Sequence, residues 1–325
     1  MSDNSATPIP LDDLARVVLP IVAVTRNAEW HAIGTSFIVA VPDPKRAVLL
    51  TAAHNLQYVA RLNAPRQLHH SSTPLEFRSP KPSFISLEYT DVYICLVGSA
   101  HPVLAELVGA WFCDAFDVAP ILVRIREDDD ITFTEKLALN TSPIQSATRV
   151  MAVGFPGMLA ASDADFEKGK FIASLQLQLQ CKFGEAVRKC PKGIGIHKSP
   201  GFLVSCPLDS GMSGGPVIDL TGNTPTVRGI VAGDVSNTPN EPSRGSGLQA
   251  FASMLWTAMV IETQINIELG DGNILNSRGA TLLDLVRHGF IDDVGRSHEH
   301  VRTEEHDGVL RFWWDSSSNV TSPAA

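Results

Sequence analysis

The chain has 325 residues, of which 44% are hydrophobic and 19% are charged. This composition is typical of a soluble globular protein and disfavours a disordered one. The formal net charge of −9 disfavours general nucleic-acid binding, which needs a basic surface. No apolar run reaches the roughly 18–20 residues of a bilayer span. From the charge we expect no nucleic-acid partner, and from the short apolar runs we expect no membrane partner.

The N-terminal segment MSDNSATPIPLDD has neither the basic nor the apolar region of a secretory signal. The five cysteines form an odd and sparse set, which is typical of free thiols in a reducing compartment. Cys181 and Cys190 flank a short polar stretch and could form a disulfide if the protein were exported. We expect a cytoplasmic protein.

Short segments that are β-branched or alternate in polarity fill the chain from about residue 17 to residue 250, and turn residues separate them. Examples are GTSFIVAV, AVLLTAA and VRGIVAG. Helical periodicity is largely missing there, apart from an opening turn at LDDLARVV. Many short strands with Gly/Pro turns predict an all-β sandwich or barrel.

The acidic run REDDD follows the last strand of the first half, and the next clear strand begins near Arg149. Beyond Gly247 the pattern changes, because FASMLWTAMVIETQINIEL and ATLLDLVRHGF have apolar residues at helical spacing. The predicted parts are an N-terminal arm (1–16), a first barrel (17–127), a linker (128–148), a second barrel (149–262) and a C-terminal α-helical extension with a disordered tail (263–325).

The segment DSGMSGGPVID sets Ser213 among Gly211, Gly214 and Gly215. Glycine costs roughly 0.5–1 kcal/mol relative to alanine in regular structure, so three of them indicate a turn that a Cβ would obstruct. Such a turn can expose the serine and aim backbone N–H groups at one spot, as an oxyanion hole requires. A glycine-rich hairpin turn without chemistry is the alternative.

A serine hydroxyl becomes a good nucleophile only when a base takes its proton. His54 is the histidine that directly follows a β-rich run, in AVLLTAAHNL. An acid that orients the imidazole should precede an apolar strand, which describes Asp117 in FDVAPILVRI. Asp91 in YTDVYICLV has nearly the same setting and remains an alternative.

The segments LLTAAH, DVAPILV and SGMSGGPV resemble, in this order, the histidine, aspartate and serine motifs of the trypsin-like serine peptidases. AIGTSFIV resembles the strand that leads towards the histidine, and VMAVGFPG resembles the opening of the second barrel in bacterial members. GSGLQAFASMLWTAM resembles the final strand and helix, so the likeness covers about residues 17 to 260. The resemblance implies an all-β fold of two packed antiparallel six-stranded β-barrels with a catalytic cleft between them.

The resemblance also implies an endopeptidase that acts on protein or peptide substrates and needs no cofactor. Ser213 would be the nucleophile, His54 the general base and Asp117 the residue that orients it, while the N–H groups of Gly211 and Ser213 would form the oxyanion hole. Digestive members have an aspartate where this chain has Met212, so activation by a newly cut N-terminus is not expected.

The segments that wall the substrate pocket in the family are CPLDS, VAGDV and GSGLQ in this chain. Pro207 is nearest to the place where a basic-specific member keeps a buried aspartate, so we expect small or medium apolar residues to be preferred over lysine and arginine. An aspartate that pointed into the pocket, Asp209 or Asp234, would reverse this preference. The expected substrate-binding residues are Pro207, Ala232, Gly233, Asp234 and Gly247.

Three other hypotheses remain open. GMSGG also fits the nucleophile elbow of α/β-hydrolases, but that fold places its acid and histidine after the serine and leaves TAAH and DVAPILV unexplained. A trypsin-like fold can serve as a protein-binding module without turnover. The histidines outside the motif lack the partners of a zinc site, so we expect no metal; they are His69, His70, His298, His300 and His306.

Residues 263–325 resemble no known family. We consider two roles for them, the binding of a partner protein and the covering of one barrel.

Overall fold

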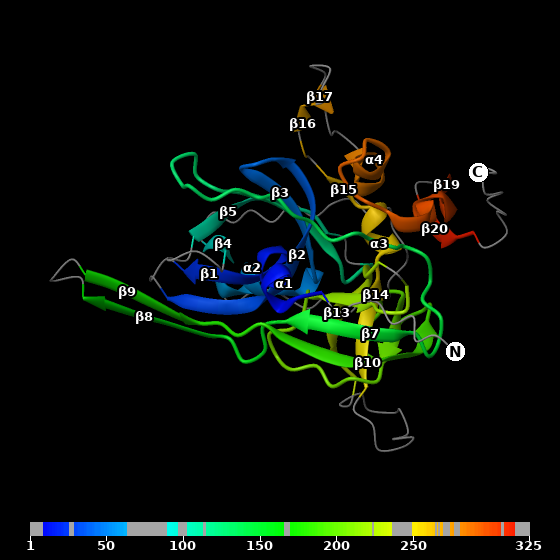
Figure 1. Ribbon diagram of the computed structural model, residues 1–325, viewed down its shortest axis with the longest axis horizontal. Helices are drawn as coiled ribbons and strands as arrows, with labels where there is room; N and C mark the ends of the chain where they lie inside the picture. Colours follow the sequence, from blue (N-terminus) through cyan, green and yellow to red (C-terminus); the bar gives the residue numbers. More distant parts are fainter. Residues whose placement is uncertain are drawn as a thin grey trace.

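The computed structural model describes residues 9–25, 29–63, 90–96, 103–112, 115–165, 170–222, 224–235, 249–263, 265, 267–268, 274–275, 280–306 and 309–315. Two closed six-stranded antiparallel barrels make up most of this part of the chain (Figure 1). The all-β fold of two packed barrels that the sequence predicts is therefore confirmed.

The first barrel has the strand order β1-β2-β3-β6-β5-β4. Its inward side chains are aliphatic and form a core in which Leu49, Ile94 and Ile121 are each 0% exposed. A short helix, α1 (Leu11–Val17), precedes the barrel and matches the predicted opening turn. The strands are β1 (Val18–Thr25), β2 (Trp30–Asp43), β3 (Arg46–Thr51), β4 (Thr90–Leu96), β5 (Val103–Ala110) and β6 (Ala119–Arg124).

The second barrel has the strand order β10-β11-β14-β13-β12-β7. Val150, Val217 and Ala252 are buried in its core. The strands are β7 (Arg149–Gly154), β10 (Gln180–Cys190), β11 (Gly201–Val204), β12 (Pro216–Asp219), β13 (Thr226–Asp234) and β14 (Ala250–Met254). A separate hairpin of β8 (Leu159–Asp165) and β9 (Lys170–Gln176) extends away from the barrels (Figure 1, left).

The segment FASMLWTAM begins as a strand and ends as a short helix, as the family resemblance implies, whereas its periodicity alone predicted a helix throughout. All five residues of β14 are buried, and the strand pairs with β11 on one side and β13 on the other. Only α3 (Trp256–Met259) is helical. Periodicity alone cannot distinguish a short strand that is buried on both faces from a buried helix, and this explains the error.

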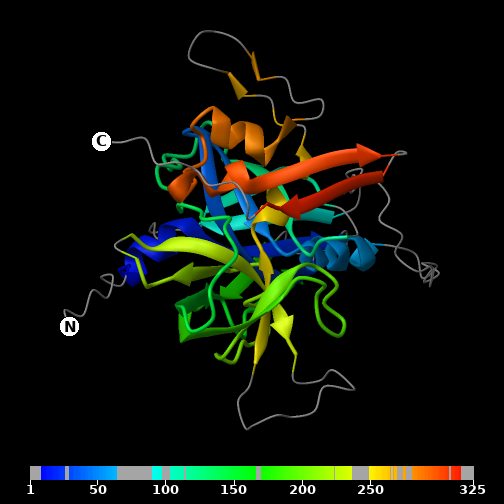
Figure 2. The same ribbon diagram turned by 90° about the vertical axis from the view of Figure 1, so that its right-hand side faces the viewer.

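The C-terminal extension is mixed rather than α-helical throughout, and it lies beside both barrels (Figure 2). ATLLDLVRHGF does contain a helix, α4 (Leu282–Arg287), which starts at a capping box of Thr281 and Asp284. The other elements are the strands β15 (Glu262–Thr263), β16 (Ile267–Glu268), β17 (Ile274–Leu275) and β18 (Ala280–Thr281), the 3-10 helix η1 (Val294–His300), and the hairpin of β19 (Val301–His306) and β20 (Val309–Trp314).

One apolar cluster joins the two barrels and the extension. Phe37 and Leu50 reach it from the first barrel, Val153 and Ile230 from the second, and Leu285 from α4. All five side chains are at most 2% exposed, so their burial fixes the barrels against each other. The extension is thus part of the core that sets the geometry between the barrels.

Cys181 and Cys190 stand nine residues apart on the same strand, β10. At about 3.3 Å per residue they are roughly 30 Å apart, too far for a disulfide. Cys95, Cys181, Cys190 and Cys206 are all free, and Cys113 lies outside the described residues. Among the helices of the described residues, none has the length and apolar character needed to cross a membrane.

Candidate active site

His54 stands where a strand of the first barrel gives way to a helix. β3 ends at Thr51, and α2 (Ala53–Asn63) begins two residues later. The buried alanines Ala52 and Ala53 leave room for this tight connection. The His54 side chain keeps 40% of its surface exposed, so the imidazole is held on one side and open on the other.

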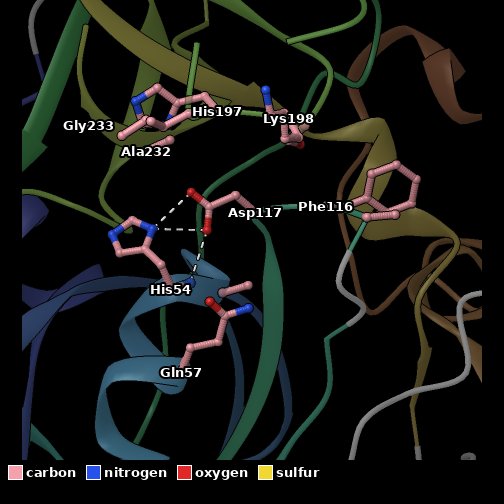
Figure 3. A pocket seen from close by; sticks show the side chains of 12 residues that line it. His54, Gln57, Phe116, Asp117, His197, Lys198, Ala232 and Gly233 are labelled. Atoms are coloured by element: carbon pink, nitrogen blue, oxygen red, sulfur yellow. Dashed lines mark hydrogen bonds and ion pairs between the residues drawn. The ribbon is translucent and has the colours of Figure 1, made fainter. Parts of the chain in front are cut away.

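Asp117 precedes β6, and the pairing of β3 with β6 brings it to His54. Thr51 at the end of β3 lies opposite Ala119 at the start of β6, so the residues that flank this pair meet at one edge of the barrel. The Nδ1 atom of His54 lies 2.9 Å from both carboxylate oxygens of Asp117. The backbone N–H of His54 donates to the same carboxylate at 3.0 Å (Figure 3).

The environment of Asp117 favours its charged form. Burial alone would raise the pKa of this carboxyl group, but the hydrogen bonds from His54 and the positive charges of His54 and His197 outweigh it and lower the pKa below 3.8. Asp117 is therefore a carboxylate at neutral pH and can stabilise a protonated imidazole.

Asp91 lies on β4, whose backbone pairs with β1 at Val24. The neighbours of β3 in the barrel are β2 and β6, so β4 is not adjacent to the strand that leads to His54. The Asp91 side chain lies outside the described residues. The hydrogen bonds of His54 go to Asp117.

The serine segment forms the glycine-dependent turn that the sequence predicts. Gly211 and Gly214 have φ values of +97° and +89°, which L side chains rarely adopt. A Cβ on Gly214 would lie 2.1 Å from the carbonyl oxygen of Thr35, and one on Gly215 would lie 1.9 Å from that of Val153. The turn therefore packs its backbone directly against the first barrel and against β7.

Two backbone N–H groups in the turn that carries Ser213 are available to bind a ligand. The N–H of Met212 donates to Asp209 and that of Gly214 donates to Val231. Within the described part of the chain, the N–H groups of Gly211 and Ser213 have no acceptor. Both could therefore bind an oxygen atom of a ligand.

The main chain of Ser213 is bonded to the first barrel beside His54. Its carbonyl oxygen accepts hydrogen bonds from the N–H of Thr35 at 2.8 Å and from Nδ2 of Asn55 at 2.9 Å. Sequence reasoning identified neither partner. The only signal was a polar amide between Ala53 and the buried Leu56, next to a predicted base.

A pocket of about 440 Å³ opens beside the His54–Asp117 pair (Figure 3). Of the predicted substrate-binding residues, Ala232 and Gly233 line it. The lining residues come from both barrels and from the loop between β10 and β11: Ala53, His54, Gln57, Ala115, Phe116, Asp117, Ile196, His197, Lys198, Ser199, Ala232 and Gly233.

The other predicted substrate-binding residues lie elsewhere or are not described. Pro207 is exposed on the loop after β11 and is not part of the pocket lining. Asp234 pairs through its backbone with Ala250, but its side chain lies outside the described residues, as does Gly247. Asp209 forms an ion pair with Lys182 at 2.9 Å.

His197 is a site residue that sequence reasoning missed. Its ring stacks on Phe251 with a centroid distance of 4.9 Å, and a Cβ on Gly233 would lie 3.2 Å from its Cε1 atom. Ile196 beside it lines the pocket and is 74% exposed. The loop between β10 and β11 carries no motif, so no sequence signal could have placed it at the cleft.

Met212, which stands where digestive trypsin-like peptidases have an aspartate, is 0% exposed in the core of the second barrel. The turn around Ser213 is thus held from inside by apolar packing.

Ser213 is followed by the strand β12, whereas the nucleophile elbow of α/β-hydrolases leads into a helix. The α/β-hydrolase alternative is therefore wrong.

No histidine cluster in the described ranges forms a metal site. Nδ1 of His298 is hydrogen-bonded to the buried carboxylate of Asp293 at 2.6 Å, and this pair is not a ligand set. Groups of three or more metal-ligating side chains do not occur among the described residues. His69 and His70, and the side chain of His306, lie outside them.

No protein-family model matches the chain, and no curated protein matches it. Among solved structures, the chain is similar to the active form of the Rv3671c protease from M. tuberculosis, with 16% identity, a TM-score of 0.42 and coverage of 89% of this chain and 91% of that chain. The inactive form of the Rv3671c protease shows 17% identity, a TM-score of 0.38 and coverage of 77% and 92%. The trypsin-like fold rests on the two closed barrels of the chain itself.

Proposed function

We propose that this protein is a serine endopeptidase that hydrolyses peptide bonds through an acyl-enzyme on Ser213. The observation that carries the proposal is the hydrogen bond of His54 Nδ1 to the carboxylate of Asp117, at 2.9 Å to each oxygen. This bond leaves Nε2 as the free nitrogen of the imidazole, which is the atom that a general base uses on a serine hydroxyl.

In the proposed reaction, Oγ of Ser213 attacks the carbonyl carbon of the substrate while Nε2 of His54 takes the hydroxyl proton. Asp117 stabilises the imidazolium that forms, and the lowered pKa of its carboxyl group supports this role. The N–H groups of Gly211 and Ser213 would bind the negative oxygen of the tetrahedral intermediate. His54 then gives its proton to the leaving amine, and water releases the acyl group by the same steps in reverse.

The pocket beside His54 supports an extended peptide as the substrate. Ala232 and Gly233, near the end of β13, are small and leave space next to the imidazole. Ile196 and Phe116 add apolar surface to the pocket. Apolar groups of a peptide that enter this space gain roughly 25 cal/mol per Å² of surface removed from water. The small residues of β13 thus favour close approach of a peptide backbone.

The second candidate is a binding module without turnover. The open pocket would serve such a module equally well, because it can hold a peptide with or without cleavage. The pairing of His54 with the charged Asp117 favours the enzyme, since a module that only binds does not need an oriented base.

The test is the incubation of the protein with a peptide library derived from a proteome, followed by mass spectrometry of new termini. Wild-type protein should create new termini at a restricted set of residues, and Ser213→Ala should create none. Equal patterns of termini for the two proteins would overturn the proposal, while binding of peptides by both without cleavage would favour the binding module.

A further inference from the structure

Two polar side chains beside the first barrel, Asn55 and Thr35, bond to the turn that carries Ser213, and Thr51 bonds to both of these residues. Asn55 donates from Nδ2 to the carbonyl oxygen of Ser213 at 2.9 Å and to Oγ1 of Thr51 at 3.1 Å. Thr51 donates to the carbonyl oxygen of Thr35 at 2.7 Å. Thr35 donates from Oγ1 to the carbonyl oxygen of Gly211 at 2.7 Å. We call Thr35, Thr51 and Asn55 the cross-barrel cluster.

Thr35 and Asn55 both bond across the two barrels, and Asn55 is the one that stands next to His54. It directly follows His54 in α2, so the helix fixes its position relative to the imidazole. Its side-chain amide bonds to a carbonyl that is 158 residues away in the chain, on the other barrel. The main chains of the base and of the serine are thereby connected through a single side chain.

The hydrogen-bond pattern fixes the orientation of the Asn55 amide. The Ser213 carbonyl oxygen can only accept, so the NH₂ group and not the amide oxygen must face it. Both hydrogens of this NH₂ group are used, one on Ser213 and one on Thr51. Asn55 is 3% exposed, so water cannot replace these bonds without a rearrangement of the core.

Two glycines make room for this amide. A Cβ on Gly34 would lie 2.4 Å from Nδ2 of Asn55, and a Cβ on Gly214 would lie 2.8 Å from the same atom. The backbone of each barrel thus approaches the amide as closely as the absence of a side chain allows. The space is filled on both sides, which leaves the amide one position.

We propose that Asn55 is a positioning residue that sets the main chain of Ser213 at a fixed place relative to His54. The inference rests on the proposed function, because its consequence for chemistry is the reach of the serine hydroxyl to the imidazole. A shift of about 1 Å in reacting groups can lower a rate roughly 10²-fold, so loss of this bond should slow acylation while substrate affinity changes little.

The test compares Asn55→Leu, which removes the donor at similar volume, with Thr257→Val. Thr257 is 0% exposed and donates to the carbonyl oxygen of Met254 at 2.6 Å, so its variant loses one buried bond away from the cleft. The first readout is the labelling of Ser213 by a fluorophosphonate, resolved into the rate at saturation and the concentration for half-saturation. The second is amide hydrogen exchange of the segment 211–215.

For Asn55→Leu we expect the saturating labelling rate to fall roughly 10- to 100-fold, with the half-saturating concentration within about threefold of wild type. Exchange in the segment 211–215 should become faster in Asn55→Leu and stay unchanged in Thr257→Val. An Asn55→Leu protein that labels and exchanges like wild type would overturn the inference. Equal slowing in both variants would also overturn it, because the effect would then follow from stability alone.

A wild-type protein that the probe does not label would refute the proposed function, and amide exchange would then decide on Asn55 by itself. Faster exchange of the segment 211–215 in Asn55→Leu, but not in Thr257→Val, would still show that Asn55 fixes the Ser213 backbone. Unchanged exchange would contradict it.

Discussion

The imidazole of His54 and the carboxylate of Asp117 are joined by three contacts: Nδ1 lies 2.9 Å from each carboxylate oxygen, and the backbone N–H of His54 donates at 3.0 Å. The residues are 63 positions apart in the chain, and the pairing of β3 with β6 brings them together. Because both the backbone N–H and the ring Nδ1 of His54 bond to the same carboxylate, the imidazole has one orientation.

Asp117→Asn should lower peptide turnover far more than Asp91→Asn. An asparagine can hold the imidazole in the wrong tautomer, and the corresponding change in a serine peptidase lowers turnover roughly 10⁴-fold. Asp91 serves as the matched control because it also precedes apolar strand residues, on a strand that is not adjacent to β3. Steady-state hydrolysis of one peptide by both variants measures the difference, and a larger loss in Asp91→Asn would show that the wrong acid was chosen.

The stability of the fold should depend on pH through Asp117. Because its pKa is lowered from the usual 3.8, the charged carboxylate stabilises the folded state above that value, and this contribution disappears as the pH falls through the lowered pKa. The free energy of unfolding of wild type should therefore exceed that of Asp117→Asn at pH 7, and the difference should shrink in strong acid.

Denaturant titrations of both proteins between neutral and strongly acidic pH measure this difference. Asp128→Asn, on the exposed acidic run, is the control and should change the free energy of unfolding by less than about 0.5 kcal/mol. A difference between wild type and Asp117→Asn that grows as the pH falls would contradict the assignment of a lowered pKa.

Gly214→Ala should destabilise the protein by about 2 kcal/mol or more. The left-handed backbone alone costs a residue with a Cβ roughly 1–2 kcal/mol, and here the Cβ would also lie 2.1 Å from the carbonyl oxygen of Thr35. Gly222→Ala is the control, since its nearest contact would be at 3.7 Å. Unfolding of the two variants by denaturant gives the comparison, and equal stability would mean that the turn does not need its glycine.

Cleavage should follow small or medium apolar residues rather than lysine or arginine. Phe116, Ile196 and Ala232 give the pocket apolar walls, and Asp209, which lies outside the lining, is ion-paired with Lys182 at 2.9 Å. A buried lysine or arginine without a partner would cost several kcal/mol. The positions of cleavage in a peptide library measure this preference, and a majority after basic residues would place an aspartate, Asp209 or Asp234, in the pocket.

The all-β class could be predicted from the sequence because most strands are short β-branched or alternating segments between turn residues. The choice of two six-stranded barrels came from the resemblance to the trypsin-like peptidases. The pairing of His54 with Asp117 could also be predicted, since both residues flank apolar strands and lie in motifs that resemble one family in order. The glycines around Ser213 indicated the tight turn, because their cost in regular structure needs a reason.

The rest of the site depends on contacts that leave no local pattern. His197 reaches the cleft on a loop without periodicity, and Asn55 bonds to a carbonyl 158 residues away. The segment that begins at Phe251 was expected to be helical because the strand β14 is buried on both faces, which gives it the same apolar run as a buried helix. The C-terminal extension was expected to be helical from the pattern of ATLLDLVRHGF, which does form α4, but its short strands pair with each other without a distinct local pattern. Its place in the cluster between the barrels, through Leu285, is set by tertiary packing alone.

The same packing bears on the role of the extension. Val301 at the start of β19 is 7% exposed and lies in one buried cluster with Phe116 and Trp256. Phe116 is the residue before Asp117, and its ring meets Trp256 edge to face at 6.1 Å. Burial of Val301 beside this pair favours the covering of the barrels over the binding of a partner protein for this part of the extension.

Mass spectrometry of the protein after reaction with a fluorophosphonate tests whether Ser213 is a nucleophile that His54 activates. We predict one covalent adduct per chain, located on Ser213 and lost in Ser213→Ala and in His54→Ala. Ser210→Ala, in the same segment, should still be labelled. An adduct that persists in Ser213→Ala, or a folded wild-type protein that forms none, would show that Ser213 is not an activated nucleophile.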